Sequence, residues 1–440
     1  MSRDNIIGLV LIGAILLGYS IFMAPSKEEQ LRKKEQRDSI AKVEMAARQI
    51  EQDQQKAKEQ ALAEQKKEEV LLLSDSTAND SLKSEYLQGL YGPFGVAATG
   101  EQKFIVLEND LMKLSLNTKG GSIYKVELKN LFRYDGTPLV LLDGPENKFG
   151  FNFYVGNKSI STPELFFKPF FDGKQSIDSS YTVSGSDSIT IAFRLYPQQI
   201  NETRESYIEF VYTLKGDEYM LGYQVNFKGM KDIIPANTTA LELDWQASLL
   251  RQEKNLKNER NQTTSYFKYV ADEVDYLTET KDVEKKIPSS LNWVSFKQQF
   301  FTCVLIAEKN FDKGTVSSVF ETKNDSILKQ MGAKMELAYD PTSDYTIPMS
   351  FYFGPNKYRT LKQYDHDLER QIPLGWSFFL MQWINRFAVI PVFNFLETMN
   401  LNYGIIILIL TVLLKLILLP VAYKTYLSSA RMRVLKPEIE

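Results

Sequence analysis

The chain has very few of the residues that build catalytic and metal sites, with one cysteine, Cys303, and one histidine, His366, among 440 residues. A single cysteine excludes an intramolecular disulfide and a cysteine-cluster metal site. A single histidine excludes HExxH zinc chemistry and argues against histidine-based catalysis. Phosphate loops of the GxxxxGKS/T kind and GxGxxG motifs are also missing. We therefore expect no enzyme activity, no metal and no cofactor.

An excess of charge of one sign is missing as well, since 52 basic and 55 acidic residues leave a net charge of −3. Bulk charge therefore gives no argument for nucleic-acid binding. Hydrophobic residues are 44% and charged residues 24% of the chain, which is ordinary for a globular protein. These averages argue against a wholly disordered chain and against a polytopic membrane protein as descriptions of the whole chain, but they conceal a very uneven distribution.

The amino terminus is apolar, because residues 5–26 contain no charge. At about 1.5 Å per residue a helix of this length crosses a hydrocarbon core of about 30 Å, which predicts a transmembrane anchor over residues 1–26. A cleaved signal peptide is the alternative. Asp4 beside Arg3 and the long apolar run favour the retained anchor.

The next stretch is polar and charged. Residues 27–70 hold 11 basic and 11 acidic residues without Gly or Pro, which favours a solvated spacer helix. A coiled coil that binds a partner is the alternative, although the apolar positions are too sparse for a sustained heptad seam. Residues 71–100 are rich in turn-forming residues and predict a linker.

Alternation of apolar and polar residues begins near residue 101 and continues to about 356, for example over residues 111–116 and 219–227. Turn clusters such as Lys119-Gly120-Gly121 separate these runs. Short strands at intervals of roughly 8–12 residues predict a large antiparallel β-sandwich over 101–356. Cys303 lies in an apolar run and is expected to be a buried structural thiol.

Helical periodicity returns near the carboxyl terminus. Residues 357–373 predict a connecting helix that carries His366 on its exposed polar side. Residues 374–398 predict an amphipathic helix in the plane of the membrane interface, anchored by Trp376, Trp383 and Arg386, because aromatic residues concentrate there. A helix buried in a protein core is the alternative for this stretch.

A second apolar run over residues 403–423 predicts another transmembrane helix. Residues 424–440 follow as a basic flank, which places that side in the cytoplasm. The amino terminus is then cytoplasmic, and residues 27–402 lie outside the inner membrane, in the periplasm of a Gram-negative cell. The run stops without a terminating signal at Glu440, so we expect a fragment of a longer chain. The basic side chains of the flank are Lys424, Arg431, Arg433 and Lys436.

Several motifs resemble the YidC membrane-protein insertase family. At the carboxyl end these are residues 402–407, Lys415, Pro420, Tyr423-Lys424 and residues 427–439, which are similar to the family's second transmembrane helix and the start of its first cytoplasmic loop. Supporting similarity lies earlier in the chain, at residues 117–121, 293–301, 353–358 and 372–376. The resemblance covers essentially all 440 residues.

The resemblance implies a bacterial inner-membrane, multi-pass insertase that inserts and folds membrane proteins, alone or beside the Sec translocon, without nucleotide or metal. It implies a periplasmic domain of the β-supersandwich type and a hydrophilic groove, open to cytoplasm and lipid, with a central positive residue at Lys415. The implied partners are nascent inner-membrane proteins, Sec components and the lipid bilayer, with ribosome contacts in regions beyond this segment. Arginine is usual at the Lys415 position, so lysine keeps the charge and loses the planar fork.

The charge of Lys415 within an apolar run independently indicates a polar surrounding. A charge near the middle of a membrane helix costs on the order of 2.5–3.5 kcal/mol, which favours a water-filled surrounding. Thr411 and Gly404 are expected on the same helix face, and Pro420 is expected to kink the helix because it lacks an N–H group. A lysine that snorkels to the nearer interface is the alternative.

Two other functional classes fit parts of the chain. A periplasmic adaptor, which links inner-membrane complexes to periplasmic partners, accounts for residues 1–353 but leaves the second span unexplained. A sugar-active enzyme fits the β-sandwich and its aromatic residues. A single histidine outside the strand region argues against that enzyme.

The basic flank generates a prediction about topology. Cysteines introduced singly as Ser186→Cys and Lys436→Cys should lie on opposite sides of the membrane, so a membrane-impermeant maleimide should label only one of them in vesicles of known orientation. Labelling of both positions from the same side would contradict a chain that crosses the membrane twice.

Overall fold

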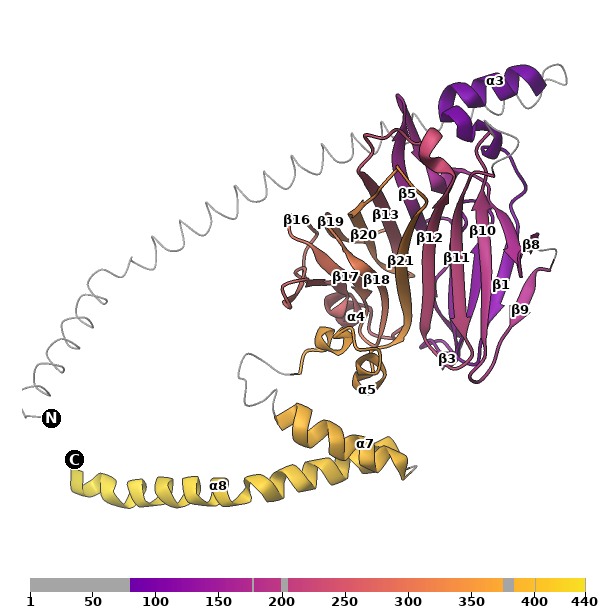
Figure 1. The fold of residues 1–440 in the computed structure, drawn as a ribbon. Coiled ribbons are helices and arrows are strands. Elements are labelled where there is room, and N and C mark those ends of the chain that lie inside the picture. Colours follow the sequence, from indigo (N-terminus) through magenta and orange to yellow (C-terminus); the bar gives the residue numbers. More distant parts are fainter. Residues whose placement is uncertain (1–79, 176–177, 199–204, 375–383, 400, 440) are drawn as a thin grey trace, which may run out of the picture. The chain divides into compact units, whose positions relative to one another are not determined.

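A computed structural model describes residues 80–175, 178–198, 205–374, 384–399 and 401–439. The expected anchor over 1–26 and spacer over 27–70 lie outside these residues. The chain divides into two compact units, Met1–Tyr86 and Leu87–Glu440. The second unit holds every strand in the described part of the chain (Figure 1).

Three sheets form the β region. The largest has ten strands, in the spatial order β15 (Val274–Tyr276), β14 (Thr264–Tyr269), β17 (Leu291–Lys297), β18 (Phe301–Phe311), β21 (Tyr345–Pro355), β12 (Met220–Lys228), β11 (Tyr207–Lys215), β10 (Ser188–Leu195), β7 (Lys168–Phe171) and β8 (Lys174–Gln175). A five-stranded sheet contains β4 (Pro138–Leu142), β3 (Ser122–Phe132), β2 (Met112–Asn117), β1 (Phe104–Glu108) and β9 (Ser180–Thr182). A six-stranded sheet contains β16 (Val283–Ile287), β19 (Lys313–Phe320), β20 (Ile327–Ala338), β13 (Ala240–Leu250), β5 (Lys148–Val155) and β6 (Lys158–Ser161).

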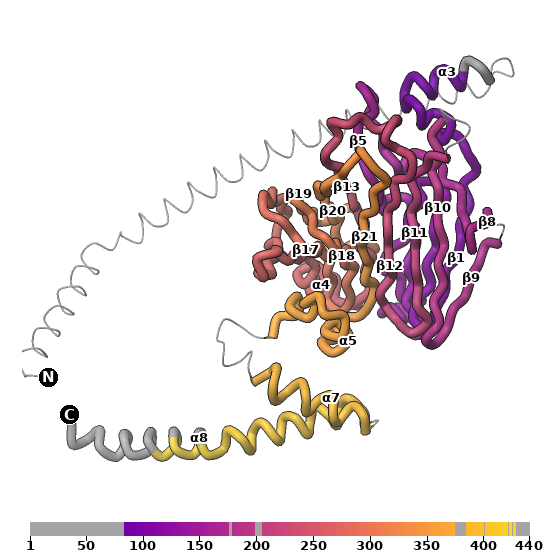
Figure 2. Tube along the Cα trace, in the orientation of Figure 1, coloured from indigo at the N-terminus to yellow at the C-terminus, as the bar shows by residue number. Residues whose placement is uncertain are grey.

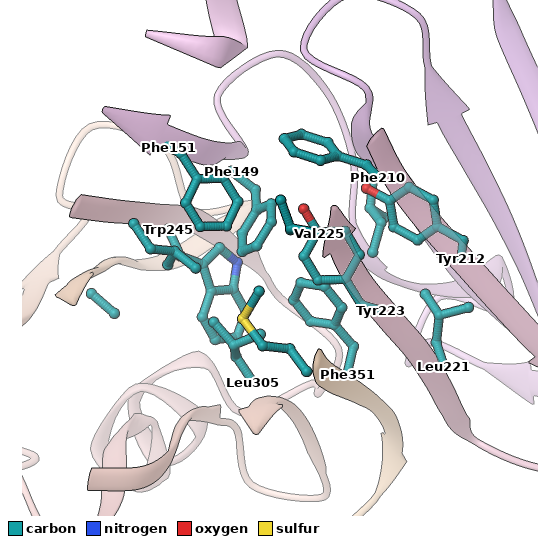
Figure 3. Packing of buried hydrophobic residues seen from close by; sticks show 14 of the residues in the cluster. Phe149, Phe151, Phe210, Tyr212, Leu221, Tyr223, Val225, Trp245, Leu305 and Phe351 are labelled. Carbon is teal, nitrogen blue, oxygen red and sulfur yellow. The ribbon is translucent and has the colours of Figure 1, made fainter. Parts of the chain in front are cut away.

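The ten-stranded sheet packs its inner face against the other two sheets in one continuous core. Figure 3 shows the part of this core where β5 and β13 of the six-stranded sheet meet the ten-stranded sheet. Aromatic rings make much of this contact. Phe149 on β5 meets Phe351 on β21 with ring centroids 5.1 Å apart, and Phe151 lies 5.7 Å from Phe210 on β11. Cys303 is buried in the same core, and burial raises the pKa of its thiol. The structure therefore confirms the large β-sandwich and the buried thiol.

The tight turn between β2 and β3 of the five-stranded sheet contacts the ten-stranded sheet. Gly121, between β2 and β3, adopts a φ of +58°, and a Cβ atom there would lie 2.9 Å from the ring of Phe167. Its carbonyl accepts a hydrogen bond of 2.7 Å from the hydroxyl of the fully buried Tyr212. Only glycine fits this close approach without strain.

The strand register defines two opposite ends of the sandwich. Leu195, Ile208, Phe227 and Tyr345 pair in one row across four strands. β21 then runs 11 residues, about 36 Å at roughly 3.3 Å per residue, to Pro355. We call the row at Tyr345 the distal end and the region around Pro355 the exit end, because the chain leaves the strands there. Figure 2 follows β21 down to α5 at the exit end.

The structure differs from the linker expected over residues 71–100. A helix, α3 (Asp80–Tyr91), occupies part of it, followed by a 3₁₀ turn, η1 (Gly92–Ala97). Gly92, with a φ of +56°, ends the helix in the left-handed conformation that glycine favours. Gly92 is one of the turn-forming residues from which the linker over 71–100 was predicted. The turn instead inserts Phe94 into the core.

The insertion of Phe94 fastens the amino-terminal end of the second unit. Its ring meets Phe153 edge-on with centroids 5.7 Å apart. The carbonyl of Pro93 accepts a 2.7 Å hydrogen bond from the backbone of Gln198, just beyond Leu195. The chain therefore joins the sandwich at the distal end.

Replacing Phe94 should loosen this attachment. Phe94 is 0% exposed, so Phe94→Ala leaves a cavity and should lower the free energy of unfolding by about 3–5 kcal/mol. Val96, two residues on, is 48% exposed, and Val96→Ala should change stability by no more than about 0.5 kcal/mol. Denaturant unfolding of both variants measures the difference. Equal stability of the two would show that Phe94 does not hold the turn.

Candidate functional site: the exit segment and the membrane-spanning helix

The chain that leaves the sandwich folds back over the outer face of the ten-stranded sheet. It forms α5 (Tyr358–Lys362) and the 3₁₀ helix η4 (Leu368–Gln371) rather than the single connecting helix expected over 357–373. Asp365 and Asp367 have φ angles of 56° and 59°, which interrupt the helix. We call residues 356–372 the exit segment. It covers a second apolar cluster that includes Trp293, Tyr352, Leu361 and Leu368.

Buried hydrogen bonds fasten the exit segment to the sheet. The Trp293 indole Nε1 donates to the carbonyl of His366 at 2.9 Å. His366 therefore lies in the turn between α5 and η4, half-buried, and not on a helix surface as expected. The side-chain oxygen of the fully buried Gln371 accepts hydrogen bonds from the hydroxyls of Ser295, at 3.2 Å, and Thr302, at 3.1 Å.

Surface charges add weaker contacts along the same segment. Lys268 Nζ lies 2.9 Å from a carboxylate oxygen of Asp367, and Arg370 lies 2.8 Å from Asp272. Exposed pairs of this kind contribute about 0–1 kcal/mol each. The buried aromatic contacts and hydrogen bonds therefore hold the exit segment on the sheet. The ion pairs contribute less to its stability.

The amphipathic segment expected over 374–398 is described only from residue 384. Trp376 and Trp383, two of the expected interface anchors, lie outside the described residues. A turn of π-helix, η5 (Asn385–Val389), leads into α7 (Ile390–Thr398). Arg386, the third expected anchor, is exposed on this π-helical turn. A π-helical turn is rare and has no sequence signal of the kind used above.

The last described helix, α8 (Tyr403–Ile439), begins five residues after the end of α7. Asn402 caps α8, because its side-chain oxygen accepts a 2.8 Å hydrogen bond from the N–H of Gly404. The Tyr403 ring stacks on Phe393 of α7, with centroids 6.2 Å apart. An Asn directly before an apolar run is a helix-start signal that the sequence analysis did not use.

An ion pair joins the start of the exit segment to α7. Lys357 Nζ lies 2.9 Å from Glu397 Oε1, and the same carboxylate oxygen accepts a 3.1 Å hydrogen bond from the Tyr403 hydroxyl. The Lys357 hydrogen bond lowers the pKa of Glu397 below its ordinary value. Nothing in the sequence indicated this contact across 40 residues.

Among the described helices, one is long and apolar enough to cross a membrane, over Tyr403–Pro420. Its 18 residues extend about 27 Å. α8 extends past Tyr423, the predicted end of the span. It has 37 residues in total, so the backbone of Lys424, Arg431, Arg433 and Lys436 is helical. The basic flank therefore belongs to the same continuous helix as the apolar span.

The predicted groove residues fall at different depths of α8. Lys415 and Thr411 are exposed and lie one turn apart. The Thr411 hydroxyl donates to the Ile407 carbonyl at 2.8 Å, so this polar group is used within the helix. Gly404 lies in the first turn, 11 residues before Lys415 and about 16 Å along the axis. Pro420 lies inside α8 without ending it.

A β-sandwich joined through a fastened exit segment to a span-length apolar helix defines a membrane-anchored protein with a large domain outside the bilayer. Residues 104–387 match the YidC periplasmic domain, and residues 394–440 match the 60Kd inner membrane protein family. The chain belongs to the YidC membrane-protein insertase family, and the β-sandwich is the periplasmic domain of that family.

Curated relatives named membrane protein insertase YidC match the whole chain. The relative from Parabacteroides distasonis is 36% identical over 451 residues, which cover 100% of this chain and 66% of the relative. Relatives from Bacteroides fragilis and Porphyromonas gingivalis strain W83 are 35% and 33% identical, with 65% and 66% of their lengths covered. The chain thus spans just under two thirds of these relatives. Their shared name is that of an insertase, in line with the expectation of a protein that is not an enzyme.

Two solved structures are among those that the chain matches. An active YidC insertase crystal structure with its first transmembrane domain resolved has a TM-score of 0.32 and 14% identity, covering 78% of this chain and 61% of that chain. A galactose mutarotase-like protein from Lactobacillus casei has a TM-score of 0.36 and 11% identity, covering 57% of this chain and 100% of that chain.

The buried bond between Trp293 and His366 generates a prediction. Trp293→Phe keeps an aromatic ring but leaves the His366 carbonyl without its donor, which should cost about 1–3 kcal/mol. Amide hydrogen exchange should become faster across the exit segment. Tyr276→Phe removes only a hydroxyl from a half-exposed ring on β15 and serves as the control. Unchanged exchange in the Trp293 variant would show that the apolar contacts alone hold the segment.

Proposed function

We propose that this chain forms the periplasmic domain and the first helix of the groove in a membrane-protein insertase. The insertase helps inner-membrane proteins to insert and fold, alone or with the Sec translocon. The observation that carries the proposal is α8 itself, an apolar span that holds one cation, Lys415, in a chain of the YidC family. A periplasmic adaptor would need neither the span nor the cation.

The position of Lys415 favours a role in handling polar segments of a client protein. Lys415 lies 12 residues after Tyr403 and 8 residues before Tyr423, so about 18 Å and 12 Å separate it from the two ends of the apolar run. Moving a charge into hydrocarbon costs several kcal/mol. A hydrated groove removes that cost for Lys415, and the same water and positive charge lower the barrier for acidic stretches of a nascent protein.

The rest of the groove requires further helices. Most side chains of α8 between Tyr403 and Pro420 are exposed in this chain, so additional spans would cover its apolar faces. In this arrangement the chain is a multi-pass protein with a cytoplasmic amino terminus and a periplasmic sandwich. Contacts with Sec components and the ribosome would involve those further regions.

Charge rather than shape at Lys415 should decide the activity. In the full-length protein, Lys415→Arg should retain insertion of a single-span client with an acidic translocated tail, because the positive charge remains in the groove. Lys415→Leu should impair insertion several-fold while the protein itself stays in the membrane, since removing the charge favours its own insertion. Protease protection of the client's tail, at matched expression, measures the difference.

Ile417→Val serves as the control, because Ile417 is an exposed apolar residue of the same span that lies about 200° around the helix from Lys415, and this change should leave insertion near the unmodified level. Equal tail protection with the arginine and leucine variants would reduce Lys415 to a snorkelling residue and would remove the groove role from α8.

A further inference from the structure

The exit end of the sandwich carries an exposed surface that the insertase groove does not use. Three loops form it, namely the β3–β4 hairpin at residues 132–138, the connection from β13 into α4 (Leu256–Gln262), and the β17–β18 turn at residues 298–300. These loops adjoin the point where the chain leaves β21 for the exit segment. Figure 1 shows α4 near α5, at the lower part of the sandwich.

Hydrogen bonds hold the three loops together as one surface. They join the Tyr134 N–H to the Gln252 carbonyl at 2.9 Å, the Gln298 side-chain amide to the Leu250 carbonyl at 2.6 Å, the Asn258 side-chain amide to Gln299 Oε1 at 3.1 Å, and the Asn356 N–H to the Phe300 carbonyl at 2.7 Å. The last of these bonds ties the surface directly to the first residue of the exit segment.

The β3–β4 hairpin holds two aromatic side chains in solvent. Phe132 is 67% exposed and Tyr134 is 46% exposed. The guanidinium of Arg133, between them, donates two hydrogen bonds of 2.9 and 2.6 Å to the Arg251 carbonyl. Arg133 N–H also donates to the Thr137 carbonyl at 2.9 Å across the turn. A fixed hairpin therefore presents the two rings, which cannot retreat into the core.

The β17–β18 turn presents a third aromatic ring. Phe300 is 51% exposed, whereas the next residue, Phe301, is buried. The side-chain amide of Asn356 donates to the carbonyls of Gln298 at 2.9 Å and Phe301 at 3.0 Å, which fixes the turn. Large exposed rings on fixed loops are the pattern expected of a contact surface.

Basic side chains surround these rings. The Arg251 guanidinium lies 4.4 Å from the centre of the Tyr134 ring, and Lys254, just before α4, and Lys257, within it, are exposed. Arg260 is paired with Asp325 at 3.4 Å and Lys357 with Glu397 at 2.9 Å, so neither adds a free charge. The remaining charged groups are Arg133, Arg251, Lys254 and Lys257 on the basic side, and Asp135, Glu253 and the buried Glu259 on the acidic side. Four positive and three negative groups leave the surface slightly positive, with both exposed lysines on the basic side.

We propose that this exit-end surface rests on the headgroup layer of the bilayer that α8 spans. Phe132, Tyr134 and Phe300 lie at the boundary with the hydrocarbon, where aromatic rings are favoured. The lysines and arginines contact anionic headgroups, as basic segments next to a membrane do. The contact fixes the tilt of the periplasmic domain over the membrane.

The path of the chain favours a bilayer over a protein partner. The chain leaves the sandwich at this end, and only 31 residues separate Gln371 from the start of α8 at Tyr403. This end is therefore the one tethered next to the lipid. The distal end, by contrast, lies about 36 Å away along β21. The inference does not depend on insertase activity.

Lipid quenching of a fluorophore tests this contact. The full-length protein, with an NBD group attached through Phe132→Cys or Phe300→Cys, is reconstituted into vesicles of phosphatidylethanolamine and phosphatidylglycerol. Tyr154→Cys provides the matched control, because Tyr154 is a 65% exposed ring on a hairpin beside Phe153 at the distal end. Doxyl-labelled lipid should quench NBD at 132 and 300 at least two-fold more than at 154. The buried Cys303 should not be labelled.

The charged residues provide a second measurement. Lys254→Gln combined with Lys257→Gln should reduce the quenching at 132 in vesicles that contain phosphatidylglycerol, and should have little effect in phosphatidylcholine vesicles. Quenching at 132 no greater than at 154 would overturn the contact. Quenching that arises only when other membrane proteins are added would also overturn it, in favour of a protein partner. An unchanged circular dichroism spectrum confirms that each variant is folded.

Discussion

The packing of the exit segment on the outer face of the ten-stranded sheet is the contact on which the arrangement of this protein depends. The inner face of that sheet forms the main core with two smaller sheets. Its outer face, around Trp293 and Tyr352, receives α5 and η4. The segment that leads toward the bilayer is therefore a packed layer of the domain.

Much of the fold could be predicted from the sequence because its signals are local. Alternating apolar residues and turn clusters predicted the β-sandwich, and the apolar run around Lys415 predicted a span. The pairing of strands could not be predicted, since β21 joins β12 and β18 only through contacts distant in sequence. Gly92 was misjudged for a related reason. A glycine that ends a helix and a glycine in a loop have the same local signal, and only the burial of Phe94 separates them.

The candidate site was predicted less completely than the fold. Lys415 could be predicted as a site residue because a single charge in an apolar run is conspicuous. The resemblance to the YidC family then suggested its role in a groove. The hydrogen bonds of Gln371 and the ion pair between Lys357 and Glu397 could not be predicted from the sequence. These residues are ordinary polar residues whose partners lie 40 or more positions away. Such contacts depend on tertiary geometry that no periodicity encodes.

The turn around Phe94 and the exit segment attach to opposite ends of the sandwich. The turn around Phe94 joins the sandwich at the distal end, while β21 delivers the chain to the exit end about 36 Å away. The sandwich is therefore held at two points that lie at opposite ends of its strands. The paired strands themselves, rather than a loop or a hinge, lie between these two points of attachment.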